Sequence, residues 1–307
     1  MVIFVRNRPR RSGMFGPVRI ASALAAWLCL CVFGLAPAAE AAQLREVTER
    51  VFPFKPGGEL DISSQNGRIT VEAWDRPEAR IQITRTVRAN SESRAAELMK
   101  ELRADVTVGD GRIEIESQYP KRSESVGIWD VLGQRVTSLN IHYYVQVPAD
   151  TRLHLETSNG ELQVRGTSAA LVGQTVNGNV EVTSTSGSVD VSTTNGNVHL
   201  VGTRGAAQAS TTNGAIEVEI RKLDPGAGVE LSTTNGNLTA MLPAELKAQL
   251  DAETTNGRVS IGYPIEMVGK SSSKMVRGRI GGGGAVVSLT TTNGNIVVTR
   301  VGESRRN

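Results

Sequence analysis

The sequence of 307 residues is poor in cysteine, histidine and aromatic residues. Its two cysteines, Cys29 and Cys31, lie in an apolar N-terminal stretch, so the rest of the chain can form neither a disulfide nor a cysteine metal site. The three histidines limit histidine-based catalysis and metal binding. Aromatic residues make up only 4% of the chain and glycine is abundant, a balance that favours thin β-sheet architecture over a compact globule.

Residues 1–41 have the pattern of a secretory signal peptide. Five arginines precede an apolar run from Ile20 to Leu35, and small residues then offer A-x-A cleavage sites ending at Ala38 or Ala41. Met14 is an alternative start. We therefore predict an exported protein, periplasmic or at the cell surface, with no transmembrane anchor after cleavage.

The charge of the chain does not indicate a nucleic-acid partner. Residues 1–41 hold five of the 34 basic residues and one of the 31 acidic residues, which leaves 29 basic and 30 acidic residues in the rest. The basic pI of about 9.0 therefore belongs to the leader.

A repeat organises the second half of the sequence. Turn pairs begin at Asn177, Ser186, Asn195, Arg204 and Asn213, each nine residues after the last and each completed by glycine. Two units make a period of 18 residues, at which Asn-Gly recurs. The predicted structural turns of the whole chain are Asn66-Gly67, Asn159-Gly160, Asn177-Gly178, Asn195-Gly196, Asn213-Gly214, Asn235-Gly236, Asn256-Gly257 and Asn293-Gly294.

Two all-β structures fit this repeat. Asn-Gly is a strong hairpin signal, which is compatible with an antiparallel meander. A parallel β-solenoid with coils of about 18 residues would instead stack like on like, such as Val180 on Val198 and Asn177 on Asn195. We favour the solenoid because stacked Asn side chains can hydrogen-bond from coil to coil. The spacing of later turns loosens, and we interpret the additional residues as loops inserted into coils.

Apolar residues recur three and five positions after each turn Asn, and a polar residue lies between them. Because strand side chains alternate, the apolar set faces the core and the polar column faces solvent. The column is Gln163, Glu181, Asp190, His199, Gln208 and Glu217. We take Gln163, Glu181, His199 and Glu217 as candidate binding residues. Their other interpretations are a solvated face of alternating charge and, around His199, a weak divalent-cation site formed with Glu181 and Glu217.

Catalytic and metal-binding chemistry is not indicated. The carboxylates are spread singly along the column, with Glu217 and Glu219 on one strand face, and hydrolysis of a glycan would need a clustered pair. We predict no catalytic residue, no metal and no cofactor. The Thr-Thr pairs before the turns place one Thr on each face, so we expect no outward two-column Thr lattice.

Residues 42–148 are predicted to form a β-rich N-terminal cap, residues 149–301 the solenoid, and residues 302–307 a polar tail. Residues 47–54 and 59–64 have the pattern of two paired strands joined by a turn. Residues 91–103 show helical spacing of Ala95, Leu98, Met99 and Leu102 behind a Ser91 or Ser93 cap, and this one helix is expected to cover a sheet edge or solenoid end. Trp129 is expected to be buried beside Tyr143 and Tyr144; if exposed on its loop, it would be a binding hot spot.

The segments NGRITVEAWD and IHYYVQVPADTRLHLETSNGELQVRG, and the repeated TTNGNV units that end in TTTNGNIVVTR, resemble the DUF4097 family, whose members are called putative adhesins. The resemblance spans about Val47 to Val301 and implies a β-strand repeat protein. It supplies no catalytic residues.

These observations predict a non-enzymatic exported β-solenoid that binds envelope or extracellular polymer through its repeat face. Its partner would be a polysaccharide, a cell-wall polymer or a protein. The alternatives are a scaffold or sensor for envelope stress that binds a protein partner and, third, an enzyme acting on polysaccharide.

Overall fold

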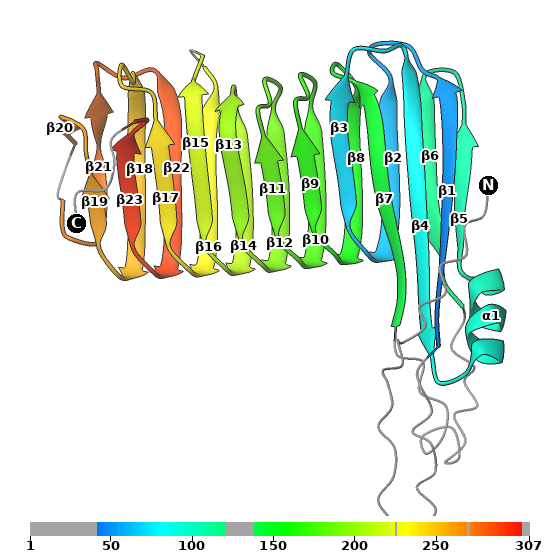
Figure 1. Ribbon diagram of the computed structural model, residues 1–307. Helices are drawn as coiled ribbons and strands as arrows, with labels where there is room; N and C mark the ends of the chain where they lie inside the picture. The colour runs from blue at the N-terminus through cyan, green and yellow to red at the C-terminus, as the bar shows by residue number, and fades with distance from the viewer. Residues whose placement is uncertain (1–41, 121–137, 225, 269–270, 303–307) are drawn as a thin grey trace, which may run out of the picture.

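The computed structural model describes residues 42–120, 138–224, 226–268 and 271–302. The predicted signal peptide with its two cysteines, Trp129 and residues 303–307 of the predicted tail lie outside these ranges. Two long β-sheets run along the molecule, and their inner faces pack against each other around the core (Figure 1). The described ranges contain no helix long and apolar enough to cross a membrane.

Sheet A has eleven strands among the described residues. In spatial order they are β1 (Ala42–Pro53), β4 (Glu78–Ala89), β7 (Ser138–Pro148), β3 (Ile69–Trp74), β9 (Leu162–Arg165), β11 (Val180–Thr183), β13 (Val198–Arg204), β15 (Ile216–Lys222), β17 (Leu238–Leu242), β23 (Ile296–Arg300) and β19 (Val259–Ile261).

Sheet B has twelve strands in the same ranges. In spatial order they are β20 (Glu266–Met267), β21 (Met275–Ile280), β18 (Ala248–Asn256), β22 (Ala285–Asn293), β16 (Gly228–Asn235), β14 (Ala207–Asn213), β12 (Val189–Asn195), β10 (Leu171–Asn177), β8 (Arg152–Asn159), β2 (Glu59–Asn66), β6 (Arg112–Gln118) and β5 (Arg103–Val108).

The repeat strands pair in parallel, which confirms an all-β fold with parallel sheets and excludes the antiparallel meander for this region. In sheet B, Thr175 of β10 lies beside Thr193 of β12, which lies beside Thr211 of β14. In sheet A, Val180 lies beside Val198. Each coil contributes one strand to each sheet, and parallel stacking already begins at β2 and β3, next to β8 and β9.

The core follows from the alternation of the strands. The apolar residues at the repeat offsets, such as Val180, Val182 and Leu200, are buried between the two sheets. One residue type departs from the apolar rule: a column of buried threonines runs along the sheet B side of the Asn-Gly turns, including Thr175, Thr193 and Thr211. Their hydroxyls need partners there, because a buried polar group without a hydrogen bond is costly.

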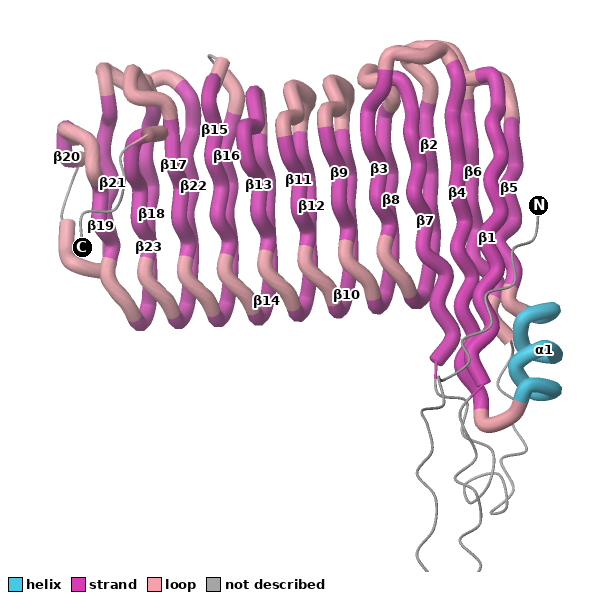
Figure 2. The backbone as a smooth tube through the Cα atoms, in the orientation of Figure 1, coloured by secondary structure: helices cyan, strands magenta, loops and turns pink. Residues whose placement is uncertain are grey.

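The turns supply those partners. Thr193 Oγ1 donates to the Gly178 carbonyl of the preceding coil at 3.0 Å, and the other threonines of the column repeat this contact. The turns approach so closely that a Cβ on Gly196 would overlap the Gly178 carbonyl oxygen. Glycine is therefore required by space across the stack, and the turns form one regular edge of the molecule (Figure 2).

The Asn side chains of these turns form a continuous hydrogen-bonded ladder. Asn195 Nδ2 donates to Asn177 Oδ1 at 2.9 Å and Asn195 Oδ1 accepts from Asn213 Nδ2 at 2.9 Å, and this pattern extends along the stack. At the first turn, the Tyr119 side chain forms hydrogen bonds with the Asn66 backbone. Its hydroxyl accepts from the Asn66 N–H at 2.9 Å and donates to the Asn66 carbonyl at 2.7 Å.

The last coils do not stack in chain order, which corrects the interpretation of the loosened spacing as loops alone. Strand β22 lies between β16 and β18, and β23 lies between β17 and β19. Asn293 consequently bonds to Asn235 on one side and to Asn256 on the other. The segment after β19 is not simply an inserted loop either, because β21 pairs antiparallel with β18 and covers that edge of sheet B.

At the other end, sheet A becomes antiparallel through β1, β4 and β7. The expected pairing of the first two strands is wrong, because β1 pairs with β4 in sheet A and β2 belongs to sheet B. The helix α1 (Glu92–Glu101) begins after the Ser91 cap, whose hydroxyl accepts from the Arg94 N–H, and packs against β1 and β4. Arg85 of β4 donates to the Leu102 carbonyl at the end of the helix.

We predict that Gly196→Ala destabilises the protein by about 1–3 kcal/mol, because the added methyl group forces the two turn backbones apart. Urea unfolding followed by circular dichroism measures the effect. Gly228→Ala is the matched control, since its methyl group would lie 3.7 Å from the nearest atom, in ordinary contact. Equal midpoints for the two variants would contradict the steric role of the turn glycine.

We also predict that Asn195→Ala costs about 1–3 kcal/mol, because it removes two ladder bonds that each contribute roughly 0.5–1.5 kcal/mol. Asn256→Ala removes the single ladder bond to Asn293 and should cost about half as much. The same urea titration compares the two. A loss at position 256 as large as that at position 195 would show that the ladder does not act bond by bond.

Candidate functional site

The four candidate binding residues lie side by side on the outer face of sheet A. Glu181 is in register with Gln163 on one side and with His199 on the other, and His199 is in register with Glu217. We call these four residues the polar row. The rest of the sequence-derived column lies elsewhere, because Asp190 and Gln208 belong to strands β12 and β14 of sheet B. The sequence offsets did not distinguish the outer face of sheet A from that of sheet B, so the predicted column combined residues of both.

Hydrogen bonds hold the first half of the polar row in place. Gln163 Nε2 donates to Glu181 Oε2 at 3.4 Å and to Glu161 Oε1 at 3.1 Å. Arg165 lies 3.8 Å from the Glu181 carboxylate, while His199 is exposed between the two glutamates. The row therefore presents carboxylate oxygens as acceptors and amide and imidazole groups as donors, at the spacing of neighbouring strands, about 4.8 Å.

The polar row does not assemble a catalytic or metal-binding cluster. Nowhere in the described ranges do three His, Cys, Asp or Glu side chains converge in a way that could hold a metal ion. Glu219, the acid nearest in sequence to Glu217, is held by Arg221 at 2.9 Å.

Beyond Gln163 the row continues into a hollow that sequence reasoning missed. Thr70 of β3 is in register with Gln163, Tyr144 of β7 with Thr70, and Gln82 of β4 with Tyr144. The hollow has a volume of about 340 Å³ and is also lined by Arg68, Thr84 and His142. The alternation in IHYYVQV carries the signal, because it buries Tyr143 and turns Tyr144 outward.

The outer face of sheet B is different in character. Ser192, Ser210, Ser232 and Thr290 form one register column, and the exposed Thr194, Thr212, Thr234 and Thr292 lie two residues further along each strand. The sequence correctly predicted that one Thr of each pair faces outward. It missed the Ser column beside it, so this face does carry two columns of hydroxyl groups.

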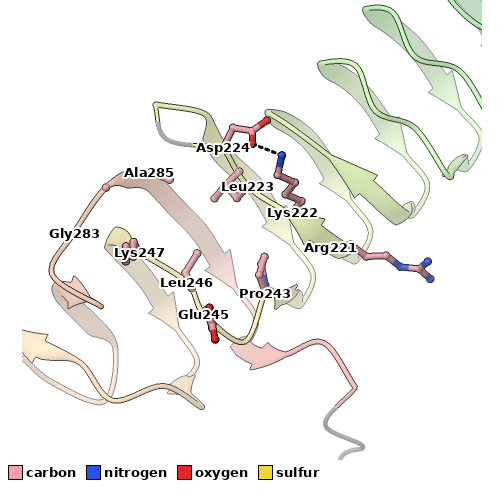
Figure 3. Close-up of a pocket in the computed structure, with 11 residues that line it drawn as sticks. Arg221, Lys222, Leu223, Asp224, Pro243, Glu245, Leu246, Lys247, Gly283 and Ala285 are labelled. Atoms are coloured by element: carbon pink, nitrogen blue, oxygen red, sulfur yellow. Dashed lines mark ion pairs between the residues drawn. The ribbon is translucent and has the colours of Figure 1, made fainter.

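A second hollow of about 320 Å³ lies among the loops opposite the Asn-Gly turns (Figure 3). It is formed by the loops after β15 and β17 and by the loop before β22, where the coils leave chain order. Lys222 is paired with Asp224 at 2.9 Å, and Arg221 points away from the other lining residues. Leu223, Pro243 and Leu246 form its apolar wall. The hollow arises because the loops of neighbouring coils separate where β22 enters the stack out of chain order.

Comparisons with known proteins cover most of the chain. A family model described as Toastrack DUF4097 matches residues 53–299. A solved structure of a putative adhesin from Bacteroides fragilis is similar at 17% identity and a TM-score of 0.43, covering 82% of this chain and 96% of that one. A putative cell adhesion protein from Clostridium sporogenes is similar at 12% identity and a TM-score of 0.36, covering 83% and 99%.

A putative lipid binding protein from Parabacteroides distasonis is similar at 12% identity and a TM-score of 0.28, covering 83% of this chain and 97% of that one. No protein with a curated description matches the sequence. Structural likeness at this level carries no argument about a ligand.

We predict that His142 in the hollow titrates below its ordinary pKa of 6.5. Partial burial of the ring lowers the pKa, and the positive charges of Arg68 and Arg45 lower it further. Because the folded state then binds this proton less readily than the unfolded chain, stability falls as the pH drops through 6.5 toward the folded pKa.

NMR titration of the His142 Cε1 proton measures this pKa. Arg68→Gln should raise it toward 6.5, since the backbone N–H of residue 68 still donates to Nδ1 while the nearby charge is gone. A midpoint at or above 6.5 in the unaltered protein would contradict the prediction.

Proposed function

This chain belongs to the Toastrack DUF4097 family, and from that premise we propose the following function. The protein is a non-enzymatic β-solenoid that binds a hydroxyl-rich polymer, a polysaccharide of the cell envelope or its surroundings, along the outer face of sheet A. In this proposal, coils of about 18 residues form the binding scaffold, and residues 42–148 cap its N-terminal end. The leader pattern of residues 1–41 supports export to the periplasm or the cell surface.

The observation that carries the proposal is the register of the polar row. Gln163, Glu181, His199 and Glu217 come from four successive strands of one sheet, so they form a straight line of hydrogen-bonding groups. A polymer with hydroxyl groups along its length can meet several of these groups at once. Such multivalent contact gives useful affinity even when each contact is weak.

The charge of the row favours an uncharged or cationic polymer over a polyanion. Glu181 and Glu217 would repel a chain of carboxylates or phosphates laid along them. Arg165, which lies 3.8 Å from the Glu181 carboxylate, offsets part of this repulsion at one end of the row. Hydroxyl groups, in contrast, can donate to carboxylate oxygens, and such charge-assisted bonds are stronger than neutral ones.

The scaffold keeps the spacing of the row fixed. Every strand that carries a row residue is tied to its neighbours by the parallel ladder, and the Asn bonds repeat along the turns. Little backbone freedom is therefore lost on binding, which lowers the entropic cost of association.

The test is cosedimentation of residues 42–307 with insoluble polysaccharides and purified envelope polymer. Glu181→Ala/Glu217→Ala should bind at least about tenfold more weakly, because a hydrogen bond to a charged group contributes roughly 1.5–3 kcal/mol. The matched control is Asp190→Ala/Glu230→Ala, which removes two exposed carboxylates from the outer face of sheet B.

Equal loss in both double variants would reject sheet A as the binding face. Failure of every polymer to bind, together with recovery of one defined protein from the envelope, would replace this proposal with the protein-binding scaffold.

A further inference from the structure

We propose that the hollow bounded by Tyr144 is a subsite for one uncharged pyranose ring. The hollow lies at the end of the polar row, so this inference deepens the proposed function and rests on it for the remainder of the polymer. What this inference adds is a sugar-stacking site on β3, β4 and β7 that binds a short neutral oligosaccharide.

The hollow is built from two parallel lines of outward side chains. Gln82, Tyr144 and Thr70 form one line across β4, β7 and β3, and Thr84, His142 and Arg68 form the next. Two short threonines lie among four long side chains on an otherwise flat sheet, which produces the depression. Its volume of about 340 Å³ falls within the range of roughly 300–1,000 Å³ that is typical of ligand sites.

The orientation of the Tyr144 ring is set from outside the hollow. Its hydroxyl donates to Glu72 Oε2 at 2.6 Å, and Glu72 lies one outward position beyond Thr70 on the neighbouring strand. The ring therefore leans across the sheet from β7 toward β3. The hydrogen bond to Glu72 also raises the pKa of Tyr144, which keeps the hydroxyl protonated. A fixed aromatic ring offers an apolar surface at a small cost in side-chain entropy.

Donors and acceptors for sugar hydroxyls surround this ring. The amide of Gln82 and the hydroxyls of Thr70 and Thr84 can each donate and accept. The Arg68 backbone N–H donates to His142 Nδ1 at 3.0 Å, so the neutral imidazole carries its proton on Nε2 and can donate there. An aromatic surface combined with several neutral polar groups matches a pyranose ring, which has apolar C–H groups and a rim of hydroxyls.

The charges around the hollow select against an acidic sugar. Arg68 is the cation of the lining, and its guanidinium is paired with Glu161 at 2.7 Å. Glu72 is bonded to the Tyr144 hydroxyl, and Glu49 beside Gln82 is paired with Arg80 at 2.8 Å. A sugar carboxylate would find Arg68 and Arg80 already paired with glutamates, and it would meet Arg45 near His142 together with the carboxylates of three glutamates. An uncharged ring avoids that repulsion.

The hollow is continuous with the polar row, so one polymer chain can occupy both. Thr70 Oγ1 lies 3.5 Å from Gln163 Oε1, at the junction between the two. A chain that lies along Gln163, Glu181 and His199 therefore has its end, or one of its rings, over Tyr144.

Isothermal titration calorimetry with cellohexaose, maltohexaose and hexagalacturonate tests the proposal on residues 42–307. One of the two neutral hexasaccharides should bind, and hexagalacturonate should bind more weakly. Tyr144→Leu should weaken that binding about tenfold, as expected for loss of an aromatic anchor. Tyr144→Phe keeps the ring but loses the hydrogen bond to Glu72 that orients it, so its affinity should lie between those of the unaltered protein and Tyr144→Leu. Thermal unfolding of both variants checks that they fold.

The His142 Cε1 NMR signal should shift when the neutral hexasaccharide is added, and Tyr144→Leu should need about tenfold more hexasaccharide for the same shift. The proposal is overturned if neither neutral hexasaccharide binds, if Tyr144→Leu binds as well as Tyr144→Phe, or if hexagalacturonate binds most tightly. Glu181→Ala/Glu217→Ala separates this proposal from the polymer proposal. Lost polymer binding with hexasaccharide binding that still depends on Tyr144 supports both, whereas unaltered polymer binding rejects the row and leaves the subsite standing.

Discussion

The close approach of successive turn backbones is the constraint on which the stack depends. Apart from Gly67, which faces the Ile141 carbonyl, each glycine of the Asn-Gly turns faces the carbonyl of a glycine in the neighbouring coil, and there is no space for a side chain between Gly178 and Gly196. The same carbonyl accepts the buried Thr193 hydroxyl, so one contact satisfies a polar group and sets the distance between coils. A shift of one residue would place a Cβ in this gap and turn apolar side chains outward, so the register is fixed.

The turn also explains why the two faces differ. Sheet B strands run into the Asn-Gly turn, and the residues just before it serve the turn itself, as Thr193 and Asn195 do. Close to the turn, the outer face of sheet B is a regular array of Ser and Thr, whereas the column further from the turn holds Val172, Asp190, Gln208 and Glu230. Sheet A strands follow the turn and are free of this role, so their outward positions vary. A face that varies can select a ligand, which favours sheet A as the binding face.

Much of the fold could be predicted from sequence because the repeat encodes it locally. The recurrence of Thr-Thr-Asn-Gly indicates parallel stacking, and the structure has parallel sheets in this region. The order of the last coils could not be predicted, since Asn256 and Asn293 belong to nearly identical turns and the sequence does not say which of them lies next to Asn235. The hollow at Tyr144 was missed for a related reason: it needs three strands from distant segments, and two of those contacts are antiparallel or outside the repeat.

The unusual order of the last coils also limits the candidate site. The line of the polar row continues from Glu217 to Thr239 of β17 and then to Val297 of β23, where a buried Thr and a Val interrupt it before the exposed Ser260 of β19. Strand β22 must enter between β16 and β18 before the end of sheet B is complete, so this end forms through contacts distant in sequence. The inserted coil therefore joins the last coil to the rest of the stack, and β21 covers the edge of sheet B beyond it. The polar surface available to a ligand extends from Tyr144 to Glu217, over the strands whose spacing the turn contacts hold fixed.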